Sequence, residues 1–140
     1  MIILFGLMRR SGAHEQRRQF GLSETEWRIM AQLGEFAPLS LNGLAESLLL
    51  DRGQLSRTMK GMVERGLVSR ERKPGGPEIE LDLTKQGREM HARMVLRAIE
   101  RDRVLVEGIP EEELQTLRRV IDAMIARAEA LMDEATPDVE

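Results

Sequence analysis

Residues 51–83, DRGQLSRTMKGMVERGLVSRERKPGGPEIELDL, form the stretch that decides the predicted fold. The first half is expected to form one helix, because Asp51 can accept hydrogen bonds from the free amides of a first turn and Gln54 completes a capping box. Gly66 stands where a helix ends in a left-handed residue. The second half predicts two short strands joined by a Pro-Gly-Gly-Pro tip, since apolar and acidic residues alternate after the tip.

The helix expected in the first half has two unlike faces. At about 100° per residue, a predicted buried stripe gathers Leu55, Met59, Met62 and Val63. The opposite face has small or hydrogen-bonding residues near its start and cations further along, namely Gly53, Gln54, Arg57, Lys60 and Gly61. Such a face suits a helix that enters a major groove by its N-terminal end. An ordinary amphipathic helix with a solvated polar face is the alternative, and the hairpin that follows favours DNA.

Another helix is expected just before this stretch, over residues 41–50, and Ser40 can cap it. Two helices followed by a hairpin predict a winged helix-turn-helix, a mainly α fold with a small β-hairpin wing. The amides at a helix start attract phosphate, so Ser40 and Asn42 are candidates to hold a DNA backbone. The alternative for Ser40 is that it only caps the helix, and both roles are compatible.

The charges of the predicted wing are expected to be partly paired. Alternation places Arg70 and Arg72 on one face of a strand over residues 67–73, across from Glu78 and Glu80 of the next strand. That pairing would neutralise part of the arginine charge, and the Pro-Gly-Gly-Pro tip has no side chain that reads DNA. The wing is therefore expected to contribute fit and core packing more than minor-groove contacts.

Charge is distributed unevenly along the chain. The formal net charge is -3, yet residues 51–73 contain seven Lys or Arg against three acids, a local balance of +4. Residues 98–140 contain twelve acids against five Arg, a balance of -7. This asymmetry is typical of a protein in which one face meets phosphates and the rest avoids them, with chance clustering as the alternative.

Composition argues against several other functions. With no cysteine there is no disulfide, thiol nucleophile or thiol redox sensor, and His14 and His91 are too far apart in sequence to suggest a zinc site. We therefore expect no metal and no cofactor. The acidic pair Glu111 and Glu112 fits the first turn of a helix, where a charge-dipole role suffices, so no enzyme is expected. The early apolar run is too short to span a bilayer and lacks the pattern of a secretion signal, which favours the cytoplasm.

Long helices are predicted on both sides of the central stretch. A first helix is expected over residues 1–19, and a second begins with a capping box formed by Ser23 and Glu26. Trp27, the only tryptophan, is interpreted as a core anchor in preference to a ligand contact. Two further helices are expected, over residues 84–107 and from Pro110 onward.

The last helix carries an apolar seam at alternating steps of three and four residues. The chain has few other apolar segments that could cover this seam or the apolar N-terminal residues. The seam could, however, pack within one monomer. A two-fold dimer would cover both. The residues predicted at this dimer interface are Ile2, Ile3, Phe5, Leu117, Ile121, Met124 and Leu131.

Three segments together resemble the MarR family of transcriptional regulators. LSETEWRIMAQLG is similar to the second helix of the family, and LSLNGLAESLLLDRGQLSRTMKGMVERGLVSRER to its helix-turn-helix and first wing strand. LDLTKQGRE is similar to the step from the wing to the fifth helix, although winged-helix proteins share it widely. DRGQLSRTMKGMVERGLV is the most specific piece.

The resemblance implies a homodimer held by the first, fifth and sixth helices, with two recognition helices set for a pseudo-palindromic operator. In such proteins the residues that match Gly53, Gln54 and Arg57 approach base edges. The arginine that enters the minor groove near the wing tip is missing here, or Arg72 or Lys73 takes its role. The residues expected near phosphates are Ser40, Asn42, Arg52, Ser56, Lys60, Arg70, Arg72 and Lys73.

Family members often bind small, frequently aromatic or anionic effectors in a cleft between the dimerisation helices and the DNA-binding lobe. His14, Arg17, Arg18 and Trp27 fall near the position of that cleft, so the resemblance implies an effector site there. A solvated surface is the alternative for the histidine and the two arginines.

The sequence thus predicts a sequence-specific regulator that binds double-stranded DNA as a homodimer and acts as a ligand-responsive repressor. Residues 1–22 and 84–140 are expected to form long dimerisation helices, and residues 23–83 the winged helix-turn-helix lobe of one integrated domain. The alternative is a winged-helix module that binds protein and not DNA. The acidic second strand of the hairpin favours that alternative, and the +4 segment opposes it.

Overall fold

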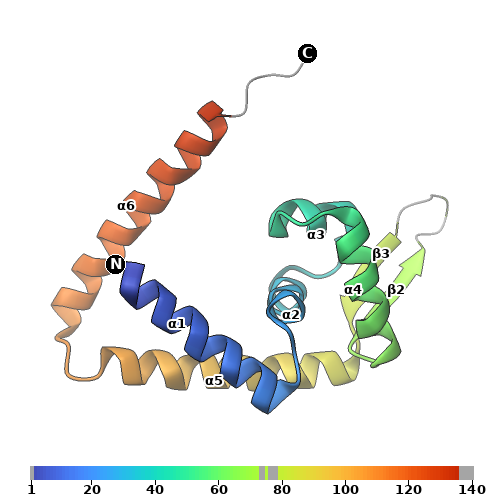
Figure 1. Ribbon diagram of the computed structural model, residues 1–140, viewed down its shortest axis with the longest axis horizontal. Helices are drawn as coiled ribbons and strands as arrows, with labels where there is room; N and C mark the ends of the chain where they lie inside the picture. The colour runs from blue at the N-terminus through green and yellow to red at the C-terminus, as the bar shows by residue number, and fades with distance from the viewer. Residues whose placement is uncertain (1, 73–74, 76–78, 136–140) are drawn as a thin grey trace. The chain divides into compact units, whose positions relative to one another are not determined.

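The computed structural model describes residues 2–72, 75 and 79–135 of the chain. The predicted mainly α fold with a small wing is confirmed (Figure 1). Its contacts divide the chain into two compact units, Met1–Leu96 and Arg97–Glu140. The elements are α1 Ile2–Glu15, the π-helical turn η1 Gln16–Phe20, α2 Glu24–Phe36, β1 Leu39–Ser40, α3 Leu41–Leu48, α4 Arg52–Glu64, β2 Val68–Arg72, β3 Ile79–Leu83, α5 Lys85–Val106 and α6 Glu111–Ala135.

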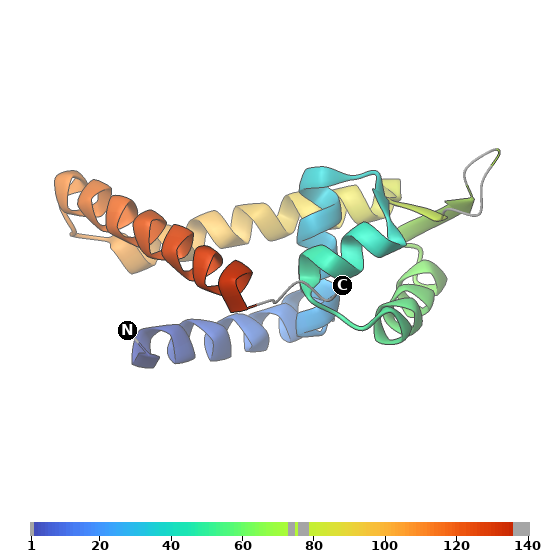
Figure 2. The ribbon, with the colours of Figure 1, turned by 90° about the horizontal axis from the view of Figure 1, so that it is seen from above.

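A small antiparallel sheet lies in the first unit, with strand order β1-β3-β2. Leu39 and Ser40, which directly precede the helix predicted over residues 41–50, supply a third strand, in which Leu39 pairs with Leu81 and Ser40 with Glu80. Strands β2 and β3 form the wing, which extends outward beyond the helices in Figure 2. Its tip lies outside the described residues except for Gly75, which has a positive φ of 89°.

The core of the first unit is built from the predicted apolar stripes. Leu55, Met59 and Met62 of α4 are fully buried, as expected. Val63 was expected in the same stripe but is 37% exposed, because it lies at the margin of the stripe in the last turn of α4. Trp27 packs against this core, and its ring meets Phe20 edge to face at 5.6 Å, so its prediction as a core anchor is confirmed.

Short-range hydrogen bonds fix the helix ends. Ser23 and Glu26 form the full predicted capping box, with Ser23 Oγ accepting from Glu26 N–H and Glu26 Oε2 accepting from Ser23 N–H. Asp51 caps α4 by accepting from the N–H of Gln54 at 2.9 Å. The Gln54 side chain makes no reciprocal bond among the described residues, so only the Asp51 half of that predicted box forms.

The end of α4 leads directly into the wing. Gly66 has a φ of +71°, and the N–H groups of residues 66 and 67 donate to the carbonyls of Val63 and Met62, which closes the helix as predicted. Helix α5 then starts against the base of the wing, with Thr84 Oγ1 accepting from Gly87 N–H. A Cβ at Gly87 would lie 2.0 Å from the Leu67 carbonyl oxygen, so only glycine permits this close start.

The second unit contains the end of α5 and the whole of α6. Gly108, with a φ of +79°, separates the two helices, and α6 follows Pro110 as predicted. Leu114 is buried, whereas the rest of the apolar seam is exposed. In the part of the chain that the structure describes, no helix is long and apolar enough to cross a membrane.

Candidate nucleic-acid interface

Both ends of α3, the first helix of the helix-turn-helix, are fixed by local geometry and hydrogen bonds. Ser40 Oγ accepts from Gly43 N–H at 3.0 Å and so caps α3, as predicted. Helix α3 ends at Leu48, two residues earlier than expected, because Leu49 takes a left-handed φ of +52°. Arg28 of α2 donates to the Leu48 carbonyl at 2.7 Å. Both helices of the helix-turn-helix therefore start and end at defined points.

The first two turns of α4 present a polar face to solvent. Arg52, Gly53, Gln54 and Arg57 are exposed. A Cβ at Gly53 would lie 3.0 Å from Asp51 Oδ1 and 3.7 Å from Arg57 Nη1, so glycine leaves room for both the cap and the arginine. Because the Gln54 side chain is not used in a cap, its amide is available to a base edge.

Five cations of this region have no acidic partner among the described residues. None of them takes part in the ion pairs seen between described residues, which involve Arg65, Arg88, Arg97 and Arg118. The unpaired cations, which we call the cationic set, are Arg52, Arg57, Lys60, Arg70 and Arg72. Their charge is therefore available to phosphates. The predicted phosphate residue Lys73 lies outside the described residues.

The register of the wing contradicts the predicted charge pairing. Arg70 lies opposite Leu81 and Arg72 opposite Ile79, whereas Glu71 lies opposite Glu80. Alternation along a strand determines which residues share a face, but a one-residue change of register exchanges every cross-strand partner. The arginines therefore do not lie across from Glu80, and Glu78 is outside the described residues.

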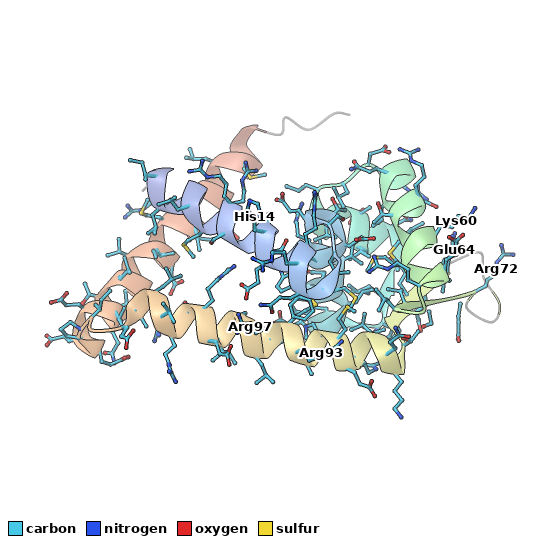
Figure 3. All side chains as sticks on the ribbon, turned by 60° about the horizontal axis from the view of Figure 1, so that its bottom comes forward. His14, Lys60, Glu64, Arg72, Arg93 and Arg97 are labelled. Atoms are coloured by element: carbon cyan, nitrogen blue, oxygen red, sulfur yellow. The ribbon has the colours of Figure 1, made fainter. Side chains whose placement is uncertain are left out.

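Directly opposite residues of an antiparallel pair share a face of the sheet. Arg70 and Arg72 thus share their face with Val68, which is buried where β2 packs against α4. Figure 3 labels Lys60 and Glu64 of α4 and Arg72 of β2, all of which belong to the first unit. Helix α4 and strand β2 pack against each other, and both carry exposed members of the cationic set.

The remaining predicted phosphate residues lie at the start of α3 and in the second turn of α4. Asn42 is exposed in the first turn of α3, beside the cap at Ser40. Ser56 is half-buried in α4, which leaves it less accessible than its neighbours on the helix. The structure thus brings Asn42, Ser40 and the start of α4 to one helix-turn-helix, as the sequence predicts.

Two open hollows lie around the end of α1. One of about 320 Å³ is lined by Ala13, His14, Arg17, Leu22 and Glu24. The other, of about 490 Å³, is lined by Ser11, His14, Glu15, Arg18 and Gln19. Three of the four predicted effector residues therefore line hollows, and His14, which is labelled in Figure 3, belongs to the lining of both. Trp27 lines neither of them, because its ring packs against Phe20.

The predicted dimer residues fall in both units. In α1, Ile3 is 79% exposed, while the side chains of Ile2 and Phe5 lie outside the described residues. In α6 every predicted member is exposed, from 43% to 66%, and these are Leu117, Ile121, Met124 and Leu131. Each helix therefore carries exposed apolar side chains within its own unit.

One contact at this site could not be predicted from the pattern. Arg65, counted in the sequence only as part of the positive segment, forms an ion pair with Glu26 and a hydrogen bond to the Gly21 carbonyl. These partners lie 39 and 44 residues away, so no local spacing signals the contact.

Comparison with known proteins identifies a family match and similar folds. Residues 20–76 match the MarR family, and no curated protein matches the chain. The fold is similar to that of a MarR/EmrR family transcriptional regulator from Acinetobacter sp. ADP1, with a TM-score of 0.72, 23% identity and 91% of each chain covered.

Two further structures extend this similarity. Streptococcus pneumoniae FabT in complex with DNA gives a TM-score of 0.84 at 17% identity, with 93% of each chain covered. The PcaV transcriptional regulator from Streptomyces coelicolor, in complex with its natural ligand, gives 0.67 at 19% identity, covering 89% of this chain and 91% of that one. At such identities these likenesses show the fold of the chain.

Proposed function

We propose that the protein is a transcriptional regulator of the MarR family that binds double-stranded DNA with sequence specificity, because residues 20–76, which include the helix-turn-helix, match that family. It acts as a homodimer on a pseudo-palindromic operator and represses transcription until a small aromatic or anionic effector releases it. Each protomer contributes one α4 to one half-site, and the half-sites lie about one duplex turn apart.

The observation that carries this proposal is the exposed, unpaired polar face of α4. Arg57 and Gln54 lie where a major-groove helix meets base edges, and neither side chain is engaged by the protein among the described residues. Arginine and glutamine are suited to bidentate contacts with guanine and adenine, respectively. We therefore assign base reading to these two residues, with Gly53 leaving room for Gln54.

Phosphate binding is assigned to the polar residues around this face. Arg52 and Lys60 flank the base-reading residues on α4, and the helix starts at Ser40 and Asn42 supply amides and hydroxyls. Arg70 and Arg72 extend the positive surface along the wing, which gives the wing a larger role than the sequence predicts. Ser56 and Lys73 stay predictions of the same kind.

Two features support the dimer and the effector. The apolar faces of α1 and α6 are exposed in the single chain, and a two-fold axis would bury both. The hollow that contains His14 and Arg17 offers cationic and hydrogen-bonding groups to an anion, with the apolar Leu22 at its wall. PcaV, a structurally similar regulator, was crystallised with its natural ligand, which supports a ligand site in this fold.

Salt dependence distinguishes this proposal from a winged-helix module that binds only protein. If the five members of the cationic set each neutralise one phosphate, the logarithm of the DNA-binding constant should fall with the logarithm of salt with a slope of roughly -4 to -5 per protomer. Lys60→Ala should reduce the magnitude of the slope by about 1, whereas Arg118→Ala on α6 should leave it unchanged. The measurement is fluorescence anisotropy of a labelled duplex across salt concentrations. A protein that binds no duplex even at low salt would support the protein-binding alternative.

A further inference from the structure

Arg65 connects the end of α4 to the joint between the first two helices, residues 21–26. Its Nη1 lies 3.1 Å from Glu26 Oε1, and its Nη2 donates to the Gly21 carbonyl oxygen at 3.1 Å. Its own backbone N–H donates to the Gly61 carbonyl at 3.0 Å and closes α4. One residue is thus fixed to the recognition helix by its main chain and to the joint by its side chain.

The joint itself is held by the same carboxylate that pairs with Arg65. Glu26 Oε2 accepts from Ser23 N–H at 2.8 Å, so one oxygen caps α2 while the other meets the guanidinium. Gly21, with a φ of +62°, ends η1 and turns the chain toward α2. Any shift of α4 at Arg65 therefore acts on both the turn and the cap.

The hollow beside α1 shares this joint. Its lining includes Leu22 and Glu24, which flank Ser23, together with His14 and Arg17 from the preceding helix. A molecule that enters the hollow contacts Leu22, which directly follows Gly21, and Glu24, which lies two residues before Glu26. The Arg65 side chain therefore links the joint, and with it the hollow, to the end of α4.

We propose that Arg65 is a positioning residue that couples α4 to the joint at residues 21–26, so that DNA on α4 and a ligand in the hollow act on the same segment. This coupling rests on the proposed DNA-binding function. The Arg65 side chain is 41% exposed and that of Glu26 is 18% exposed, so solvent screens part of their attraction. Loss of the pair is therefore expected to change the position of α4 more than the stability of the fold.

Trp27 provides a reporter within the protein for this coupling. It is the only tryptophan of the chain, it follows Glu26, and its ring contacts Phe20, which precedes Gly21. It lies in α2 and not on the base-reading face of α4. A change in its emission on DNA binding therefore reports a change at the joint.

The test follows two signals while the full-length protein is titrated with the duplex that wild type enriches from a random pool. Anisotropy of a label on the DNA reports binding, and Trp27 emission reports the joint. Arg65→Gln removes the guanidinium. Glu26→Gln removes the charge but retains a side chain that a capping box accepts. Arg88→Gln is the matched control, because it breaks another partly exposed ion pair, to Asp82 at 2.8 Å, that joins α5 to β3.

We expect wild type and Arg88→Gln to change Trp27 emission when they bind the duplex. Arg65→Gln and Glu26→Gln should still bind it, with an emission change at least about fivefold smaller. Binding by wild type with unchanged Trp27 emission, or a wild-type emission change in Arg65→Gln, would overturn the coupling alone. Failure of wild type to enrich or bind any duplex would overturn the proposed function and the coupling together.

Discussion

Replacing Arg57 with alanine is expected to weaken operator binding by roughly 10- to 100-fold and binding to random DNA much less. The Arg57 side chain is exposed on α4, has no acidic partner among the described residues, and lies one turn after the helix start. A bidentate contact between arginine and guanine discriminates against the wrong base by about 1 to 3 kcal/mol, which corresponds to this loss. Parallel anisotropy titrations with the operator and with a random duplex measure both effects.

Lys60→Ala is the matched control for this prediction. Lys60 is also exposed and unpaired, but it lies further along α4, where we assign it to phosphate. Its loss should therefore weaken binding to both duplexes by a similar factor. If Arg57→Ala behaved in the same way, with equal losses on the two duplexes, Arg57 would be a phosphate contact and the base-reading assignment would be wrong.

A second large effect is expected from Ile121→Glu in the seam of α6. Ile121 is 43% exposed in the single chain, and the proposed dimer would bury it. A carboxylate there would lose its water on dimerisation, so the variant should be a monomer with a mass near 15.9 kDa, against about twice that for wild type. Because linked half-sites add a factor on the order of 100 or more, operator affinity should fall by at least about 100-fold.

Light scattering at micromolar concentration measures the mass, and anisotropy measures the affinity. Ala126→Glu is the matched control, since Ala126 lies on the face of α6 opposite the seam and is exposed. It introduces the same charge into the same helix and should leave the dimer intact. A wild-type mass near 15.9 kDa under these conditions would contradict the proposed two-fold assembly.

Helix limits could be predicted because their signals are local. The capping box of Ser23 and Glu26, the cap at Asp51 and the left-handed Gly66 each depend on residues within one turn, and all three are found where expected. A local spacing does not always lead to the predicted hydrogen bond, however. Gln54 has the spacing of a capping residue, yet its side chain does not make that bond among the described residues, which keeps it available for DNA.

Contacts between distant elements could not be predicted in the same way. The alternation of β2 and β3 was correct, but the partner of Arg70 depends on the register, which no single strand specifies. The pairing of Leu39 with Leu81 involves a strand too short to produce a recognisable alternation. The sequence identified Arg65 only as one cation of a positive segment and did not predict its contacts, because its partners come from a different part of the chain.

The proposed DNA interface includes features that local sequence predicts and contacts between distant elements that it does not predict. The exposed face of α4 follows from a helical period of about 3.6 residues, so Arg57 and Lys60 were assigned to it from the sequence alone. The sequence suggested that Glu80 would offset the charge of the wing arginines, and the register of the strands contradicts this pairing. With Glu71 opposite Glu80, Arg70 and Arg72 instead share the face that is buried against α4 at Val68.

Selection of bound duplexes from a random pool tests the central claim most directly, because the protein itself chooses the sequences that it binds. We predict enrichment of a pseudo-palindromic sequence whose half-sites are centred about one duplex turn, roughly 10 base pairs, apart. We also predict that Arg57→Ala relaxes the preference at one position of each half-site. Recovery of sequences with no shared motif, or of a motif without two-fold symmetry, would contradict a sequence-specific homodimer.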